Sequence, residues 1–74
     1  MNMSLEVHEL IDQELEAQRA GLPKFENRKQ AEESIILTSD SIYTADADES
    51  HLQAKLRLAK LVAFSVRAME EVYV

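Results

Sequence analysis

Apolar side chains recur at helical spacing in three segments of the chain, and the C-terminal segment carries the most of them. In the first segment a narrow apolar stripe is formed by Val7, Leu10, Ile11 and Leu15. Ser4 precedes it and is a typical N-cap residue. The stretch "RAGLP" follows it and predicts a helix end with Gly21 in the left-handed conformation. We therefore expect a first helix over about residues 5–20.

The middle segment, "RKQAEESIILTSDSIYT", predicts a second helix over residues 28–44. Asn27 and Gln30 have the spacing of a capping box, in which two side chains satisfy free backbone N–H groups at a helix start. The many β-branched residues also fit a β-hairpin at about residues 34–44, which would make the fold α+β. Helix is the favoured interpretation, because the turn lacks Gly and a lone hairpin is marginally stable.

The third segment predicts a long helix over about residues 47–72, in which Asp46 and Glu49 have the spacing of an N-cap and its partner. It is either separate from the second helix or continuous with it, since no Gly or Pro lies between them. Its apolar positions cover roughly two-thirds of the circumference, whereas a surface helix needs about a third. One apolar stripe consists of Leu52, Leu56, Ala59, Ala63 and Val66. A second stripe beside it consists of Leu58, Leu61, Val62, Met69 and Val72.

These patterns predict one all-α domain over residues 1–74, a helical hairpin or three-helix unit with a long C-terminal helix. The first two helices are too short to cover both stripes, so we expect the second stripe to be an interface with a partner or another copy. The expected interface residues are Leu58, Leu61, Val62, Phe64, Met69, Val72 and Tyr73. The expected orienting charges are Arg57, Lys60 and Arg67. The alternative is that both stripes are ordinary core covered by the other two helices.

Composition narrows the class of protein further. A chain of 74 residues without Cys has no disulfide and no thiolate metal site to stabilise it, which favours oligomerisation or partner binding. The start "MNMSLEVHEL" does not have the pattern of a signal peptide, and "LVAFSV" is too short to span a bilayer. We therefore expect a cytoplasmic protein that does not bind membranes. A net charge of -6 argues against binding to nucleic acid.

Candidate catalytic and metal-binding residues are sparse. His8 and Asp12 lie on one helical face, but no third ligand accompanies them in the sequence. The acids of residues 6–16 resemble the carboxylate clusters of all-helical magnesium-dependent nucleotide pyrophosphatases, but they form one local run instead of the separated motifs of those enzymes. We predict no catalytic residue, metal site or cofactor.

We therefore expect a non-enzymatic interaction module that acts as a chaperone, adaptor or inhibitor, with another protein or a second copy as partner and a dimer as the first expectation. In size, acidity and helicity the chain resembles small chaperones of secretion machines and phage-encoded inhibitors. One alternative is a decoy whose acidic residues mimic nucleic acid. A further alternative is a carboxylate-metal hydrolase assembled in an oligomer.

Overall fold

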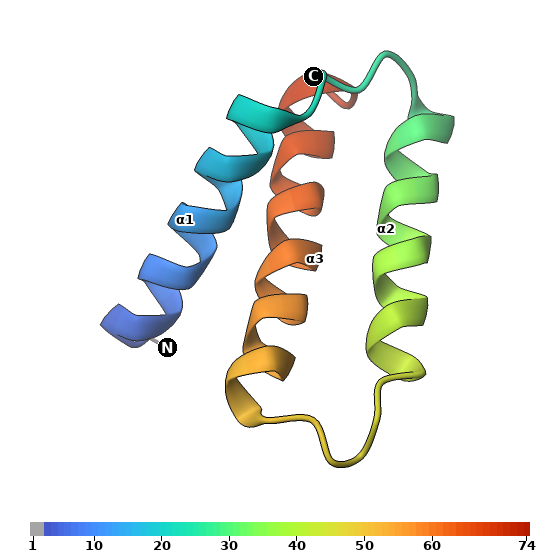
Figure 1. Cartoon of the computed structure of the whole chain (residues 1–74). Coiled ribbons are helices and arrows are strands. Elements are labelled where there is room, and N and C mark those ends of the chain that lie inside the picture. Colours follow the sequence, from blue (N-terminus) through green and yellow to red (C-terminus); the bar gives the residue numbers. More distant parts are fainter. Residues whose placement is uncertain (1–2) are drawn as a thin grey trace.

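The computed structural model describes residues 3–74 and contains three helices, α1 (Leu5–Gly21), α2 (Arg28–Tyr43) and α3 (His51–Glu71). The described residues include no strand, so the all-α prediction is confirmed and the hairpin alternative is wrong. α3 packs against both other helices, whereas α1 and α2 do not pack against each other (Figure 1). The C-terminal helix is therefore the centre of the three-helix unit.

Contacts at the helix ends define the directions of the three helices. Glu6 and Lys55, near the starts of α1 and α3, form an ion pair of 3.0 Å. Arg19 and Glu70, near the ends of the same two helices, form another of 2.8 Å. α1 and α3 are therefore parallel, and α2 runs antiparallel to α3 (Figure 1). The loop over residues 22–27 crosses the C-terminal end of α3 to connect α1 with α2.

The first two helices begin where the sequence predicts. Ser4 Oγ accepts a hydrogen bond of 3.2 Å from the Val7 N–H, and Asn27 Oδ1 accepts one of 3.0 Å from the Gln30 N–H. Gln30 Oε1 in turn accepts from the N–H of Glu26, one residue before the N-cap. These side chains satisfy backbone donors that have no partner within the first turn of a helix.

The predicted left-handed ending of α1 is wrong. Gly21 has no positive φ and belongs to the helix, and Leu22 follows it with an extended backbone. The Leu22 N–H still donates to the Gln18 carbonyl at 2.8 Å, which continues the helical pattern. The physical reason is Pro23, because a proline disfavours the helical conformation of the residue before it. The helix therefore ends without any need for a left-handed glycine.

The predicted start of α3 is also wrong. Ser50 is the N-cap, and its Oγ accepts a hydrogen bond of 3.2 Å from the Gln53 N–H. Asp46 stabilises a turn instead, because its carbonyl accepts from the Glu49 N–H at 3.0 Å and its side chain from the Asp48 N–H. Residues 44–50 therefore form a loop that separates α2 from α3.

The buried apolar core of the described chain consists of alanines alone: Ala31, Ala59, Ala63 and Ala68. Alanine lets helices approach closely, but each buried methyl group removes little apolar surface from water. The leucines of the predicted core stripe, Leu52 and Leu56, remain exposed. α3 is thus held between its neighbours by its smallest side chains, and much of its larger apolar surface stays in contact with water.

Candidate interaction surface

One face of α3 exposes large apolar side chains along most of its length. Leu58, Val62 and Met69 are 50%, 40% and 60% exposed. Together with Ser65 and Val72 they recur at alternating intervals of four and three residues, the spacing of a coiled-coil seam. We call Leu58, Val62, Ser65, Met69 and Val72 the α3 seam. Helices that pack lengthwise against one another have this spacing.

An apolar hollow adjoins the seam between α1 and α3. Its volume is about 140 Å³ and it is open to solvent. It is lined by Val7, Leu10, Ile11, Leu58, Ala59 and Val62. Lys55 also lines it and is paired with Glu6. The apolar stripe of the first helix is therefore not completely covered by α3, and the hollow is large enough to accept an apolar side chain.

The other predicted interface residues lie in different surroundings. Leu61 is half-buried, as is Val72 at the end of the seam. Phe64 is also half-buried, and its ring packs against the ring of Phe25 with centroids 6.1 Å apart. Phe64 lines a second hollow beside the 22–27 loop, of about 430 Å³, to which none of the seam residues contributes. The structure therefore gives Phe64 an intramolecular partner away from the seam.

Tyr73 is half-exposed and interacts with α2. Its hydroxyl donates a hydrogen bond of 3.2 Å to the Glu32 carboxylate and accepts one of 3.2 Å from Arg28 Nε. The guanidinium of Arg28 also lies 5.3 Å from the centroid of the tyrosine ring. The hydrogen bond that Arg28 donates to the Tyr73 oxygen, together with the electrostatic attraction of Tyr73 and of the Glu32 carboxylate, raises the pKa of Arg28, which is charged at all ordinary pH values. These contacts tie the end of the chain to the start of α2.

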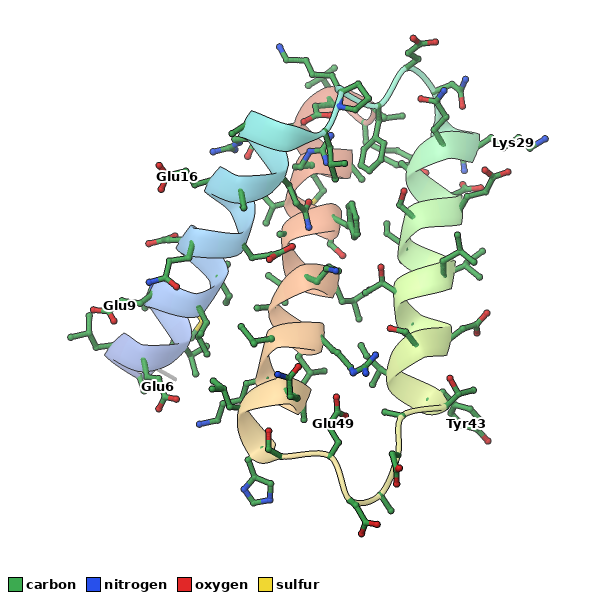
Figure 2. The ribbon with its side chains drawn as sticks, viewed as in Figure 1. Glu6, Glu9, Glu16, Lys29, Tyr43 and Glu49 are labelled. Carbon is green, nitrogen blue, oxygen red and sulfur yellow. The ribbon has the colours of Figure 1, made fainter. Side chains whose placement is uncertain are left out.

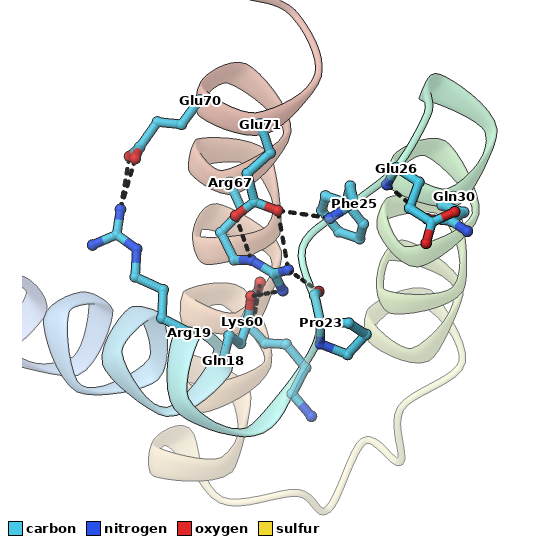
Figure 3. A network of polar contacts seen from close by, with 10 residues as sticks. All are labelled: Gln18, Arg19, Pro23, Phe25, Glu26, Gln30, Lys60, Arg67, Glu70 and Glu71. Atoms are coloured by element: carbon cyan, nitrogen blue, oxygen red, sulfur yellow. Dashed lines mark hydrogen bonds and ion pairs between the residues drawn. The ribbon is translucent and has the colours of Figure 1, made fainter.

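Arg67, predicted as a charge that orients a partner, lies inside the molecule with only 1% of its surface exposed. Its guanidinium donates to both carboxylate oxygens of Glu71, at 3.1 and 3.2 Å, and to the Pro23 carbonyl at 2.6 Å (Figure 3). It also donates to Gln18 Oε1 at 3.4 Å and lies 4.5 Å from the centroid of the Phe25 ring. Arg67 is buried because the 22–27 loop crosses its side of α3. Its charge is paired with Glu71 of the same chain.

Glu71 is the anionic partner in this network, and its side chain is 12% exposed. Burial alone would raise the pKa of the Glu71 carboxyl. Two opposing influences outweigh this effect of burial. Glu71 accepts hydrogen bonds from Arg67 and, at 2.8 Å, from the Phe25 N–H, and the positive charges of Arg67 and Lys24 lie nearby. The pKa of Glu71 therefore lies below its ordinary value of 4.5. The i, i+4 spacing of Arg67 and Glu71 was the only signal of this network in the sequence.

The two remaining predicted charges differ from each other. Arg57 is partly buried and pairs with Glu49, and it also donates to the Ser41 carbonyl at 3.5 Å. Lys60 is exposed and lines a shallow hollow with Phe64 and residues of α2. Arg57 thus connects α3 to the 44–50 loop and to the end of α2, whereas Lys60 is exposed on the side of α3 that faces α2.

The acidic side chains of α1 are divided between its two sides, since Glu6 pairs with Lys55 of α3 and Glu14 lines a hollow with α3 residues. Glu9 and Glu16 point away from the other helices (Figure 2). Over residues 3–74, no three histidine or acidic side chains come close enough together to hold a metal ion. Within the same part of the chain, no helix has the length and apolar character needed to cross a membrane.

The fold and this surface define a class: a small all-α unit of three helices whose central, C-terminal helix has one open apolar face. Comparisons with protein families, curated proteins and solved structures found no match to this chain.

Proposed function

We propose that this protein is a non-enzymatic helical interaction module that buries the α3 seam against another protein chain. The observation that carries the proposal is the contrast between the core and the seam. Only alanines are buried among the apolar side chains described, whereas Leu58, Val62 and Met69 are 40% to 60% exposed. Contiguous exposed apolar surface of this kind is typical of protein interfaces.

The energetics of a small chain support the same proposal. Fully burying a Leu, Val or Met side chain contributes about 1.5 to 3 kcal/mol, so covering the seam would stabilise this protein by several kcal/mol before the entropic cost of association. A domain of this size has only a few kcal/mol of net stability, and this chain has no Cys to form a disulfide. Association through the seam would supply the apolar burial that the alanine core does not.

The mode of binding that fits the seam is a helix packed lengthwise along α3. Side chains of the incoming helix would fit between the seam residues, and one of them would fill the hollow beside Leu58 and Val62. Lys60 lies on the side of α3 that faces α2, away from the seam, so apolar packing and not this charge would hold the incoming helix. An adaptor, a chaperone and an inhibitor all work through such a surface.

Site-specific photocrosslinking tests the proposal. Met69 is replaced by the photoreactive residue p-benzoylphenylalanine in cells that express the protein, and Glu16, which points outward from α1, receives the same replacement as the control. We expect a covalent adduct with a protein chain from position 69 and none from position 16. Adding Leu58→Asp should remove the adduct, because a charge in the seam opposes burial. Absence of an adduct from position 69 contradicts the proposal.

A further inference from the structure

We infer that the chain covering the α3 seam is a second copy of this protein, related by a two-fold axis that makes the two α3 helices antiparallel. This inference rests on the proposed function, because it names the partner of the same surface. Surface area, the spacing of the seam and the distribution of charge support it independently.

The surface area of the chain matches that of one half of a dimer. The chain exposes 5645 Å². A compact folded monomer of 8.4 kDa exposes about 4,600 Å², so this protein exposes about 1,000 Å² in excess. Each partner in a standard interface buries about 800 Å². The radius of gyration, 12.7 Å, likewise exceeds the value of about 11 Å for a compact domain of this length. The excess is therefore large enough for one interface of ordinary size.

The spacing of the seam indicates that its occupant is a helix with the same spacing. Ser65 lies at the centre of the seam, seven residues from Leu58 and seven from Val72. Its small side chain lets two helices approach closely, and its hydroxyl already donates to the Leu61 carbonyl at 2.8 Å. A two-fold axis near Ser65 places Leu58 of each copy opposite Val72 of the other. The seam is therefore complementary to itself, as a symmetric dimer requires.

The charges of the chain allow this contact and favour the antiparallel arrangement. Each copy carries a net charge of -6, but none of the five seam residues is charged. Lys55 lies on the same side as the seam near the start of α3, where it lines the hollow. A parallel arrangement would bring the two copies of Lys55 together. An antiparallel arrangement brings each toward the negative end of the helix dipole of the other α3.

Cysteine crosslinking tests the arrangement cleanly, because the natural chain has no Cys. A short thiol crosslinker is applied to purified Ser65→Cys, and we expect a covalent dimer on a denaturing gel. An equal mixture of Leu58→Cys and Val72→Cys should crosslink between the two variants far more than either variant crosslinks alone. Glu16→Cys is the control and should remain monomeric. Crosslinking of each variant with itself, and not between the two, contradicts the antiparallel arrangement.

Light scattering tests the dimer itself. We expect the wild-type mass to be twice that of one chain at micromolar concentrations, and Met69→Asp to halve it. Met69→Gln is a milder second variant for the case in which the aspartate unfolds the chain, and it should shift the monomer–dimer midpoint to higher concentration. A folded wild-type monomer at every concentration overturns the inference. If position 69 then crosslinks to a different protein, the proposed function stands without the dimer, whereas no adduct at all overturns both.

Discussion

Arg67 and Met69 lie two residues apart on α3 and occupy opposite environments. The arginine is 1% exposed and in contact with α1, the 22–27 loop and Glu71, whereas the methionine is 60% exposed. Their intrinsic preferences for the interior are the reverse of these environments. The segments that pack beside α3 therefore decide which of its faces is buried. Those segments cover the arginine side and leave the seam side open.

The two regions also differ in the forces that can stabilise them. The Arg67 network joins three segments through hydrogen bonds, and no buried side-chain polar atom among the described residues lacks a partner. A buried ion pair gives little net stability compared with apolar packing, but losing one partner is strongly destabilising. The seam has the opposite character, because its apolar side chains contribute only once another chain covers them. The network therefore holds α1 and the 22–27 loop against α3. The seam can add hydrophobic stabilisation only when another chain covers it.

The largest expected effect comes from removing the buried charge. Arg67→Met leaves the Glu71 carboxylate, the Pro23 carbonyl and the Gln18 amide oxygen without their buried donor. We expect the free energy of unfolding to fall by about 3 to 5 kcal/mol. Urea denaturation followed by circular dichroism measures this loss. Arg28→Met, at an exposed position, is the matched control and should leave stability close to that of the wild type. Equal losses in both variants would show that the network does not have this role.

The pH dependence of the free energy of unfolding tests what the Glu71 carboxylate contributes to the network. Its pKa in the folded protein is below the ordinary value of 4.5. The stability that the carboxylate contributes is therefore fully present above pH 4.5, and it is lost as the pH falls through the lower pKa of the folded protein. We expect Glu71→Gln to reduce the free energy of unfolding by about 1.5 to 3 kcal/mol at pH 7. The difference from wild type should shrink as the pH falls from 5 to 3.

Urea denaturation at pH 7, 5, 4 and 3 provides the measurement, with Glu26→Gln, at an exposed position, as the control. A difference between wild type and Glu71→Gln that stays constant over this range would disprove the linkage to the Glu71 carboxyl.

Enlarging the alanine core tests how closely α3 is held by its neighbours. Ala63 is completely buried, and Ala63→Leu has no space for the larger side chain unless the helices move apart. We expect a loss of about 1 to 3 kcal/mol, measured by thermal or urea unfolding. Ala20→Leu, at an exposed position on α1, is the control and should have almost no effect. An unchanged or increased stability for Ala63→Leu would mean that the helix contacts adapt to larger side chains.

The smallest expected effect concerns the exposed ion pair in which Arg19 donates to both carboxylate oxygens of Glu70 at 2.8 Å. Because both side chains are half-exposed, Arg19→Gln should reduce the free energy of unfolding by less than about 1 kcal/mol at low salt. The difference should disappear at about 1 M salt, where charges are screened over about 3 Å. A larger loss that persists at high salt would show that this exposed pair stabilises the fold as strongly as the buried network does.

The sequence by itself determined the class of fold and the local features of the helices. The periodic apolar positions predicted three helices, and Ser4 and Asn27 were recognisable as N-caps, because capping and periodicity depend on residues only a few positions apart. Met69 could be placed on an apolar face of the third helix for the same reason. Its exposure was expected from the small amount of chain available to cover that face, and the structure shows it exposed.

Only the tertiary structure decided which faces of α3 are covered. Arg67 is buried and Phe64 pairs with Phe25 because the 22–27 loop crosses that end of α3, a contact between residues more than 35 positions apart in the chain. The open α3 seam likewise results from the placement of α1 and α2 on separate flanks of α3. Helical periodicity fixes the side chains that share a face, but burial depends on the segments that pack there, and no local pattern contains that information.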